Sequence, residues 1–246
     1  MPKYGIIFCL YNCESTLDSC LDAWKQVKNE RFVYSAVSAP FKGYEDFNPP
    51  KDNTIELVRA ANIMDHHFYS KDFIAEIDAR GYCLDYLKSN NCDIIWMVDG
   101  DEVYTVDQIN NIIKYIEDNP STAWFKLCLK NYIFDNSTYL EEPFTPARIY
   151  RVSARPFKLG TFYQDNDISY AYGENQVQNP AVKNKVVPKK VAWIAHYTWP
   201  SNEISKLKVN YQQKRWGLCS YEWADNKLQF SEDYYKNKPK PRVIKD

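Results

Sequence analysis

Two aspartates separated by one glycine, Asp99 and Asp101, are the residues of this sequence best suited to chemistry. They come directly after the apolar run Ile94 to Val98, which predicts a buried strand. Ligands of open α/β sheets bind at the carboxyl ends of strands, so these acids are expected at a binding edge. In a turn kept tight by Gly100, two carboxylates can converge on Mg²⁺ or Mn²⁺ while a nucleotide diphosphate supplies further oxygens. The alternative is a solvated turn whose acids favour the N-terminus of the next helix.

The segments around this turn alternate between strand and helix patterns. Tyr4 to Leu10 predicts a strand buried on both faces, and a capping box at Ser15 to Asp18 predicts the start of a helix. Further strands are expected over Phe32 to Ala39, Asp65 to Tyr69 and Ala123 to Leu129, and further helices over Thr54 to Ala61, Asp72 to Ser89 and Val106 to Glu117. This rhythm predicts one α/β domain.

The alternation ends near residue 130. Short strands are expected over Arg148 to Val152 and Val191 to His196, and a last helix over Glu203 to Trp216. The Lys- and Pro-rich tail from Lys236 to Asp246 is expected to be poorly ordered.

Two of these segments resemble the family 2 glycosyltransferases of the GT-A fold: Ile7 to Asn12 with Glu14 and Leu17, and Ile94 to Glu102. The resemblance implies an α/β fold with an open, mostly parallel sheet flanked by helices and a smaller, mixed C-terminal region on the acceptor side. It divides the chain into a nucleotide-sugar-binding half over residues 1–130, an acceptor-side half of the same domain over 131–235, and a tail over 236–246.

The family pattern also implies residues for the donor. A Tyr-Asn-Glu-like loop lies under the nucleobase in the family, and it matches Tyr11, Asn12 and Glu14. The family's Asp-x-Ser-x-Asp-Thr loop is degenerate here and survives as Asp52 and the two residues after it. Arg80 and its neighbours resemble an Ala-Arg-Asn motif, which implies that this arginine lies near the uridine or the phosphates. Asp99 and Gly100 would contact the same donor.

A second match lies in the C-terminal half. It resembles the branch of the family related to lipopolysaccharide core glucosyltransferases. The matching residues are Ala147 to Arg151, then His196 to Trp199 with Ser201, Glu203, Lys206 and Tyr211. The resemblance implies that His196 is the third protein ligand of the cation, after Asp99 and Asp101. Imidazole suits Mn²⁺ better than Mg²⁺. Lys206 would meet the diphosphate. A core histidine and a solvated helix lysine are the alternatives.

An inverting transfer also needs a carboxylate that takes the proton of the acceptor hydroxyl. Family members place this base between the metal loop and the late histidine. The candidates there are Asp165, Asp167 and Glu174, in that order of preference. A surface loop rich in Asp and Asn is the alternative for each of them.

Composition excludes several classes of protein. With 31 Lys and Arg against 32 Asp and Glu, the chain lacks the basic surface that non-specific nucleic-acid binding requires. It has no apolar run long enough for a membrane span and no signal-peptide core, so a cytoplasmic location is expected. The 7 cysteines are expected to be reduced and structural.

The sequence also lacks the motifs of other nucleotide-binding classes. Walker A and Gly-x-Gly-x-x-Gly loops are absent, as is the Gly-rich loop of sugar-nucleotide pyrophosphorylases.

The sequence therefore predicts a glycosyltransferase that uses Mn²⁺ or Mg²⁺ and a nucleotide-sugar, with a UDP-sugar favoured. The expected acceptor is a glycan or glycolipid, and the oligomeric state is left open. The alternative is a degenerate nucleotide-sugar-binding module that has lost turnover.

Overall fold

The computed structural model describes residues 1–40, 52–133, 138–141, 145–152, 183–199, 206, 209, 221–224, 227–230, 236 and 242–245. Its helices are α1 (Glu14–Val27), α2 (Thr54–Ala61), α3 (Glu76–Ser89) and α4 (Val106–Glu117). Its strands are β1 (Tyr4–Cys9), β2 (Phe32–Ser38), β3 (His66–Tyr69), β4 (Ile94–Asp99), β5 (Glu102–Val103), β6 (Trp124–Lys126), β7 (Cys128–Ile133), β8 (Thr138–Glu141), β9 (Ala147–Arg151), β10 (Asn184–Val186), β11 (Trp193–Trp199), β12 (Tyr221–Ala224), β13 (Lys227–Phe230) and β14 (Arg242–Lys245).

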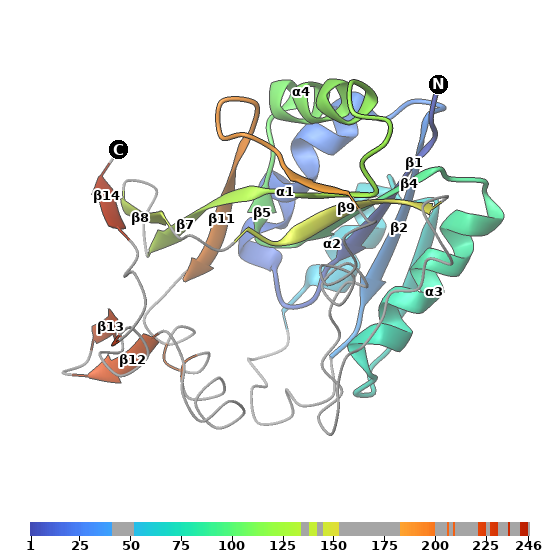
Figure 1. Ribbon diagram of the computed structural model, residues 1–246. Helices are drawn as coiled ribbons and strands as arrows, with labels where there is room; N and C mark the ends of the chain where they lie inside the picture. The colour runs from blue at the N-terminus through green and yellow to red at the C-terminus, as the bar shows by residue number, and fades with distance from the viewer. Residues whose placement is uncertain are drawn as a thin grey trace.

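The larger sheet has seven strands in the order β10-β6-β9-β4-β1-β2-β3. Strands β3, β2, β1 and β4 run parallel, β9 runs antiparallel to β4, and β6 runs antiparallel to β9. A five-stranded sheet, β14-β8-β7-β11-β5, extends from the other side of the molecule, on the left in Figure 1. The larger sheet is therefore mixed but mostly parallel, as the sequence predicts.

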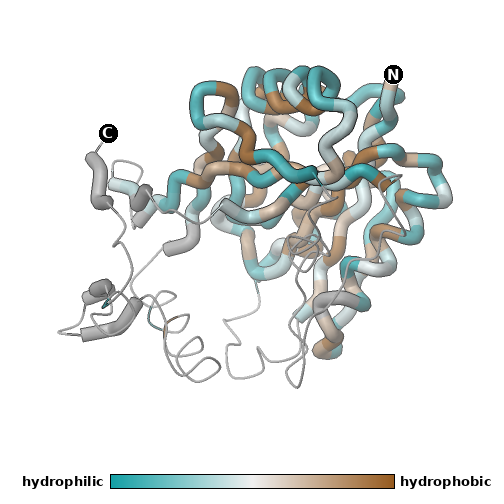
Figure 2. Tube along the Cα trace, viewed as in Figure 1, coloured by the Kyte–Doolittle hydropathy of each residue, from teal (hydrophilic) through white to brown (hydrophobic). Residues whose placement is uncertain are grey.

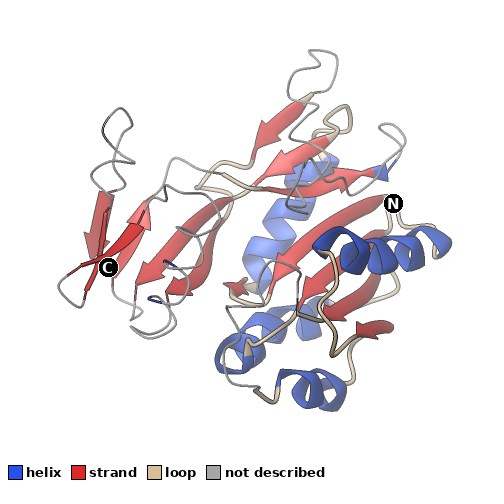
Figure 3. Cartoon of the chain, turned by 90° about the horizontal axis from the view of Figure 1, so that it is seen from below, coloured by secondary structure: helices blue, strands red, loops and turns tan. Residues whose placement is uncertain are grey.

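Both faces of the central strands are buried, which explains their continuous apolar runs. In β1 and β4, Ile6 and Trp96 belong to the cluster that α1, α2 and α4 cover, whereas Ile7 and Met97 face the cluster that α3 covers. Figure 3 shows helices on both sides of the strands. In Figure 2 the hydrophobic segments gather in the strands, and hydrophilic segments are frequent along the surrounding helices.

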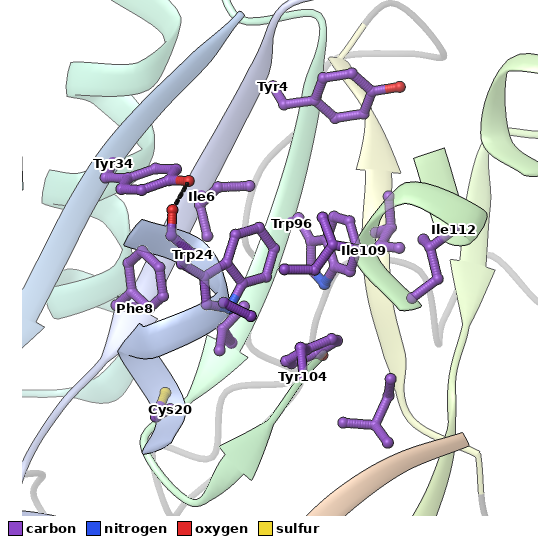
Figure 4. Close-up of a cluster of buried hydrophobic side chains, with 14 of the residues drawn as sticks. Tyr4, Ile6, Phe8, Cys20, Trp24, Tyr34, Trp96, Tyr104, Ile109 and Ile112 are labelled. Carbon is purple, nitrogen blue, oxygen red and sulfur yellow. Dashed lines mark hydrogen bonds between the residues drawn. The ribbon is translucent and has the colours of Figure 1, made fainter. Parts of the chain in front are cut away.

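Trp24 of α1 is the centre of the larger cluster. It has no solvent exposure and makes edge contacts with the rings of Phe8, Tyr34, Trp96 and Tyr104 at centroid distances of 5.0–6.1 Å. The Tyr34 hydroxyl donates to the Trp24 carbonyl at 2.8 Å, the dashed line in Figure 4. These contacts fix α1 across β1, β2 and β4, so the loops at the ends of these strands rest on a rigid core.

Most helix and strand predictions are confirmed, and α2 and α4 have the expected bounds. The capping box is wrong: α1 begins at Glu14 with Cys13 at the N-cap, and no side chain caps it. The Thr16 hydroxyl instead donates to the carbonyls of Cys13 and Gly100. Helix α3 begins at Glu76, later than predicted, because Ile74 N donates to the Pro40 carbonyl beyond the end of β2 and keeps the chain extended there.

The second half of the chain also departs from the predicted pattern. The strand expected over Ala123 to Leu129 is divided at Leu127 between β6 in the larger sheet and β7 in the smaller one. Residues 242–245, expected in a poorly ordered tail, form β14 and pair antiparallel with β8. The β-branched residues Val243 and Ile244 favour this extended conformation. Strands β9 and β10, which follow residue 130, join the larger sheet.

Candidate active site

The turn from Asp99 to Asp101 joins β4 to β5 and is fastened to the β1–α1 loop. Gly100 N donates to the Cys9 carbonyl at 3.0 Å, and the Gly100 carbonyl accepts from the Thr16 hydroxyl at 2.7 Å. A Cβ atom at Gly100 would lie only 2.6 Å from the Cys13 sulfur, so no larger residue fits without a shift. The glycine is therefore required by close packing at the carboxyl end of the sheet.

Asp99, the first acid of the turn, faces two arginines. Its Oδ2 atom lies 2.5 Å from an Arg148 nitrogen, and its Oδ1 atom lies 3.6 Å from an Arg80 nitrogen. Arg148 reaches Asp99 because β9 runs antiparallel beside β4, with Ile149 opposite Trp96. Asp99 is thus held by guanidinium groups, and its side chain remains 27% exposed.

Glu102 follows the turn and is completely buried. Its Oε1 atom accepts from Arg148 Nε at 2.8 Å and from an Arg148 terminal nitrogen at 2.6 Å, and its Oε2 atom accepts from the Tyr104 hydroxyl at 3.0 Å. Burial raises the pKa of Glu102, and the Arg148 charge opposes this effect. Burial also acts to lower the pKa of Arg148, but Asp99 and Glu102 raise it above its ordinary value, so the guanidinium stays charged.

Asp101, the second acid of the turn, faces His196 instead. Strand β11 runs antiparallel to β5, and its Tyr197 N donates to the Asp101 carbonyl at 2.8 Å. This pairing places His196 Nε2 at 3.3 Å from Asp101 Oδ1. The other ring nitrogen, Nδ1, lies 2.6 Å from Asn131 Oδ1 on β7. The structure therefore brings together the acid and the histidine that the sequence singled out, although 95 positions separate them in the chain.

The donor set formed by Asp101 and His196 fits a divalent cation. A carboxylate oxygen and an imidazole nitrogen face each other, and the second ring nitrogen contacts an amide oxygen, which can serve as the outer-shell acceptor that a metal-bound histidine needs. Asp99 fits less well because its carboxylate contacts Arg148 and Arg80. Within the described ranges, no three His, Cys, Asp or Glu side chains are grouped closely enough to form a complete ligand set.

The predicted nucleobase residues Glu14 and Asp52 contact each other's chain segments. The Asp52 carboxylate accepts from Glu14 N at 2.9 Å and from Thr54 N at 3.0 Å, while the Glu14 carboxylate accepts from Asn53 N at 2.9 Å. Each acid therefore satisfies backbone donors at the start of α1 or α2, where helices have N–H groups without an intrahelical acceptor. The degenerate Asp52 segment keeps a structural role, and its contact with a nucleobase stays a prediction.

Of the remaining predicted residues, Tyr11, Asn12 and Lys206 are described by the structure and the base candidates are not. Tyr11 and Asn12 lie in the loop after β1, where Asn12 adopts a left-handed φ of 49° and burial, then Asp52, raises the pKa of Tyr11. Lys206 is exposed and has a helical backbone conformation. The base candidates lie outside the described residues: Asp165, Asp167 and Glu174.

Sequence reasoning missed three residues of this site. Arg148 is one residue of a family motif, Glu102 is the residue that follows the turn, and Asn131 belongs to no motif given above. A buried carboxylate needs a cationic partner, so the position of Glu102 after a buried strand was a usable signal for an arginine elsewhere. The other two histidines lie on β3, away from this turn: His66 and His67 contact the hydroxyls of Ser35 and Ser38 at 2.9 Å.

Comparison with known proteins identifies the fold. No family model and no curated protein sequence matches the chain. Among solved structures, glucosyl-3-phosphoglycerate synthase from Mycobacterium tuberculosis in complex with Mn²⁺, UDP and phosphoglyceric acid has a TM-score of 0.52 at 10% identity, covering 94% of this chain and 87% of that one. TarS from S. aureus has a TM-score of 0.50 at 14% identity. That match covers 86% of this chain and spans 40% of the TarS chain.

A shorter TarS structure, residues 1–349 with UDP-GlcNAc, has a TM-score of 0.50 at 14% identity and is covered over 66% of its length. These structures are glycosyltransferases of the GT-A type, and at such identities the likeness concerns the fold. The chain therefore has a GT-A-like α/β fold, as the sequence predicts. No helix in the described part of the chain is long and apolar enough to cross a bilayer.

Proposed function

We propose that this GT-A-like chain is a metal-dependent glycosyltransferase that moves a sugar from a nucleotide-sugar, preferably a UDP-sugar, to a hydroxyl of a glycan or glycolipid. The observation that carries the proposal is the approach of His196 Nε2 to Asp101 Oδ1, 3.3 Å apart at the carboxyl end of β4. Ligands of open α/β sheets bind at this edge. The glycosyltransferase structures of similar fold include complexes with UDP-GlcNAc and with Mn²⁺ and UDP, which supports the choice of donor.

The charges of the site favour a cation and a diphosphate together. Asp99, Asp101 and Glu102 bring three carboxylates, against the two guanidiniums of Arg80 and Arg148. One negative charge is left over when Glu102 is ionised, so the site by itself does not attract an anionic diphosphate. A divalent cation held by Asp101 and His196 reverses this sign, and it supplies Lewis-acid stabilisation of the leaving diphosphate.

The chain's own residues then have separate roles. Asp101 and His196 hold the cation, and Asp99 faces the donor. Arg80 lies beside Asp99, near the phosphates of the donor. Tyr11, Asn12, Glu14 and Asp52 line the nucleobase side, and Lys206 meets the diphosphate. Transfer proceeds with inversion, with Asp165, or else Asp167 or Glu174, taking the proton of the acceptor hydroxyl.

The proposal extends to family and location. The motifs around His196 and Arg148 support membership of family 2 and of the branch related to lipopolysaccharide core glucosyltransferases. We place the enzyme in the cytoplasm, where it would meet a lipid-linked acceptor from the cytosolic side.

The first test is thermal unfolding with UDP-, GDP-, CMP- and dTDP-sugars, with and without Mn²⁺. Ligands that bind the folded state raise the apparent stability by mass action. We expect the largest rise with a UDP-sugar and Mn²⁺, no rise with Asp101→Asn, and an unchanged rise with the control Asp85→Asn, which alters an exposed acid of α3. A wild-type chain that no nucleotide-sugar stabilises contradicts the proposal.

Turnover separates the enzyme from the alternative, a nucleotide-sugar-binding module without activity. The degenerate Asp52 segment, whose acid is occupied by backbone donors, is the observation that favours the module. Slow release of UDP from the bound donor, lost in Asp101→Asn, would identify an enzyme. Binding that depends on Mn²⁺ without any release of UDP would identify the module.

A further inference from the structure

Arg148 connects the two acids on either side of Asp101. One of its terminal nitrogens lies 2.5 Å from Asp99 Oδ2 and 2.6 Å from Glu102 Oε1, and its Nε donates to the same Glu102 oxygen at 2.8 Å. The Arg148 side chain is 12% exposed and that of Glu102 is 0% exposed. A guanidinium in this setting is rigid, because its planar fork is fixed by several hydrogen bonds at once.

Glu102 anchors Arg148 to the core. Its second oxygen accepts from the Tyr104 hydroxyl, and Tyr104 packs with its ring against Trp96 and Trp24. A buried carboxylate is retained only where partners compensate its loss of water, and here both oxygens are satisfied. The chain of contacts therefore runs from the aromatic core through Tyr104, Glu102 and Arg148 to the partly exposed carboxylate of Asp99.

We infer that Arg148 is a positioning residue that holds the Asp99 carboxylate in its donor-facing orientation and away from the cation. This inference rests on the proposed function. The two acids of the turn then divide their work: Asp99 is paired with arginine, and Asp101 is paired with His196. Without Arg148, Asp99 would become a second carboxylate beside the cation, and the orientation of the donor would be lost.

Variants must avoid leaving Glu102 buried without a partner. Arg148→Met alone does this and would destabilise the fold. The double variant Arg148→Met/Glu102→Gln removes both charges, and the glutamine oxygen can still accept from the Tyr104 hydroxyl. Arg151→Met is the matched control: Arg151 lies on the same strand and donates to the carbonyls of Thr122 and Ile116 at 3.0 and 2.7 Å, far from the turn.

The test is calorimetric titration of UDP in the presence of Mn²⁺, with ligand-independent thermal unfolding to verify the fold. We expect the double variant to lose UDP affinity by about tenfold or more, because small losses of orientation are costly at such sites. Arg151→Met should lose stability but keep the affinity for UDP. Arg148→Lys, which keeps the charge without the planar fork, should bind UDP more tightly than the double variant but more weakly than the wild type.

A mutant cycle makes the inference specific. If Arg148 acts through Asp99, the triple variant Arg148→Met/Glu102→Gln/Asp99→Asn should lose about tenfold in UDP affinity. The double variant and Asp99→Asn alone should each show about the same loss, since the effects of residues that act as a unit are not additive. Losses that multiply, or a double variant with wild-type affinity, would overturn the role of Arg148 while leaving the proposed function intact. A wild-type chain that binds neither UDP nor a UDP-sugar would overturn both.

Discussion

The orientation of His196 is decided by its neighbour on β7. Asn131 is 7% exposed and its Oδ1 atom lies 2.6 Å from His196 Nδ1, so the amide oxygen accepts from an Nδ1–H group. In the neutral ring that donates through Nδ1, the unprotonated Nε2 atom lies 3.3 Å from Asp101 Oδ1. The proposed metal site requires this form of the ring, and in it Asn131 would be the outer-shell partner of His196.

Asn131→Leu should therefore weaken Mn²⁺ binding in the presence of UDP by about 10- to 100-fold, the usual effect of losing an outer-shell partner. Asn131→Asp, which keeps an acceptor oxygen, should retain most of the affinity. Calorimetric titration with Mn²⁺ measures both, and thermal unfolding without metal shows whether the fold is intact. Equal Mn²⁺ affinity in Asn131→Leu and the wild type would show that the amide does not orient the imidazole.

At the scale of elements, the β4–β5 turn and helix α3 each contain a glycine, but for different reasons. A Cβ atom at Gly100 would lie 2.6 Å from Cys13 Sγ and 2.9 Å from Cys13 Cβ, whereas a Cβ atom at Gly81 would meet nothing within 4 Å. The first glycine allows the turn to pack against the start of α1. The second only adds backbone freedom to the unfolded chain and lowers helix propensity.

The two glycines should respond in opposite directions to alanine. Gly100→Ala is expected to destabilise the fold by about 1–3 kcal/mol through overpacking against buried Cys13. Gly81→Ala is expected to stabilise it by about 1 kcal/mol through helix propensity. Urea unfolding of both variants measures the difference. A Gly100→Ala variant with an unchanged midpoint would mean that the turn has room to move and is not fixed by Cys13.

At the scale of the whole molecule, the core contains thiols as well as aromatic rings. Cys13 and Cys83 are buried on opposite faces of the larger sheet, and burial raises the pKa of each thiol to about 12. These thiols stay protonated in the folded chain under conditions in which an exposed thiol ionises. They are therefore packing residues with little nucleophilic reactivity, as the sequence predicts.

This shift has a defined effect on stability. A raised pKa in the folded state stabilises the protein fully below the unfolded thiol pKa of about 9, and the contribution is lost as the pH rises toward 12. Each thiol should lower the free energy of unfolding by about 1.4 kcal/mol per pH unit within that window. Buried Tyr4 and Tyr34, whose pKa values burial also raises, act in the same direction at higher pH.

Urea unfolding at pH 8, 9 and 10 checks this expectation. The wild type should lose stability more steeply above pH 9 than Cys13→Ala/Cys83→Ala, because the double variant lacks two groups that release protons on unfolding. Comparison of slopes rather than of absolute stabilities removes the cost of the substitutions themselves. Identical slopes would show that the two thiols titrate similarly in the folded and unfolded chain.

The sequence by itself determined the local elements and the place of the turn. Helices α2 and α4 have the predicted bounds because their apolar spacing and their ends are encoded within each segment. The run from Ile94 to Val98 forms a strand buried on both faces, and Asp99 ends it at the carboxyl edge of the sheet. The GT-A-like fold followed from the family resemblance of these motifs, and a binding site at this edge stays a prediction.

Only the tertiary structure decided how the acids are partnered. Glu102 and Arg148 are 46 positions apart, and Asn131 and His196 are 65 apart. These contacts depend on β9 lying beside β4 and on β11 lying between β5 and β7, a strand order that no single segment encodes. The burial of Glu102 is likewise a property of the assembled core, and the free energy that a buried carboxylate would lose without Arg148 exists only there. The sequence therefore located the turn, and the packing of distant strands assigned Asp99 to arginine and Asp101 to histidine.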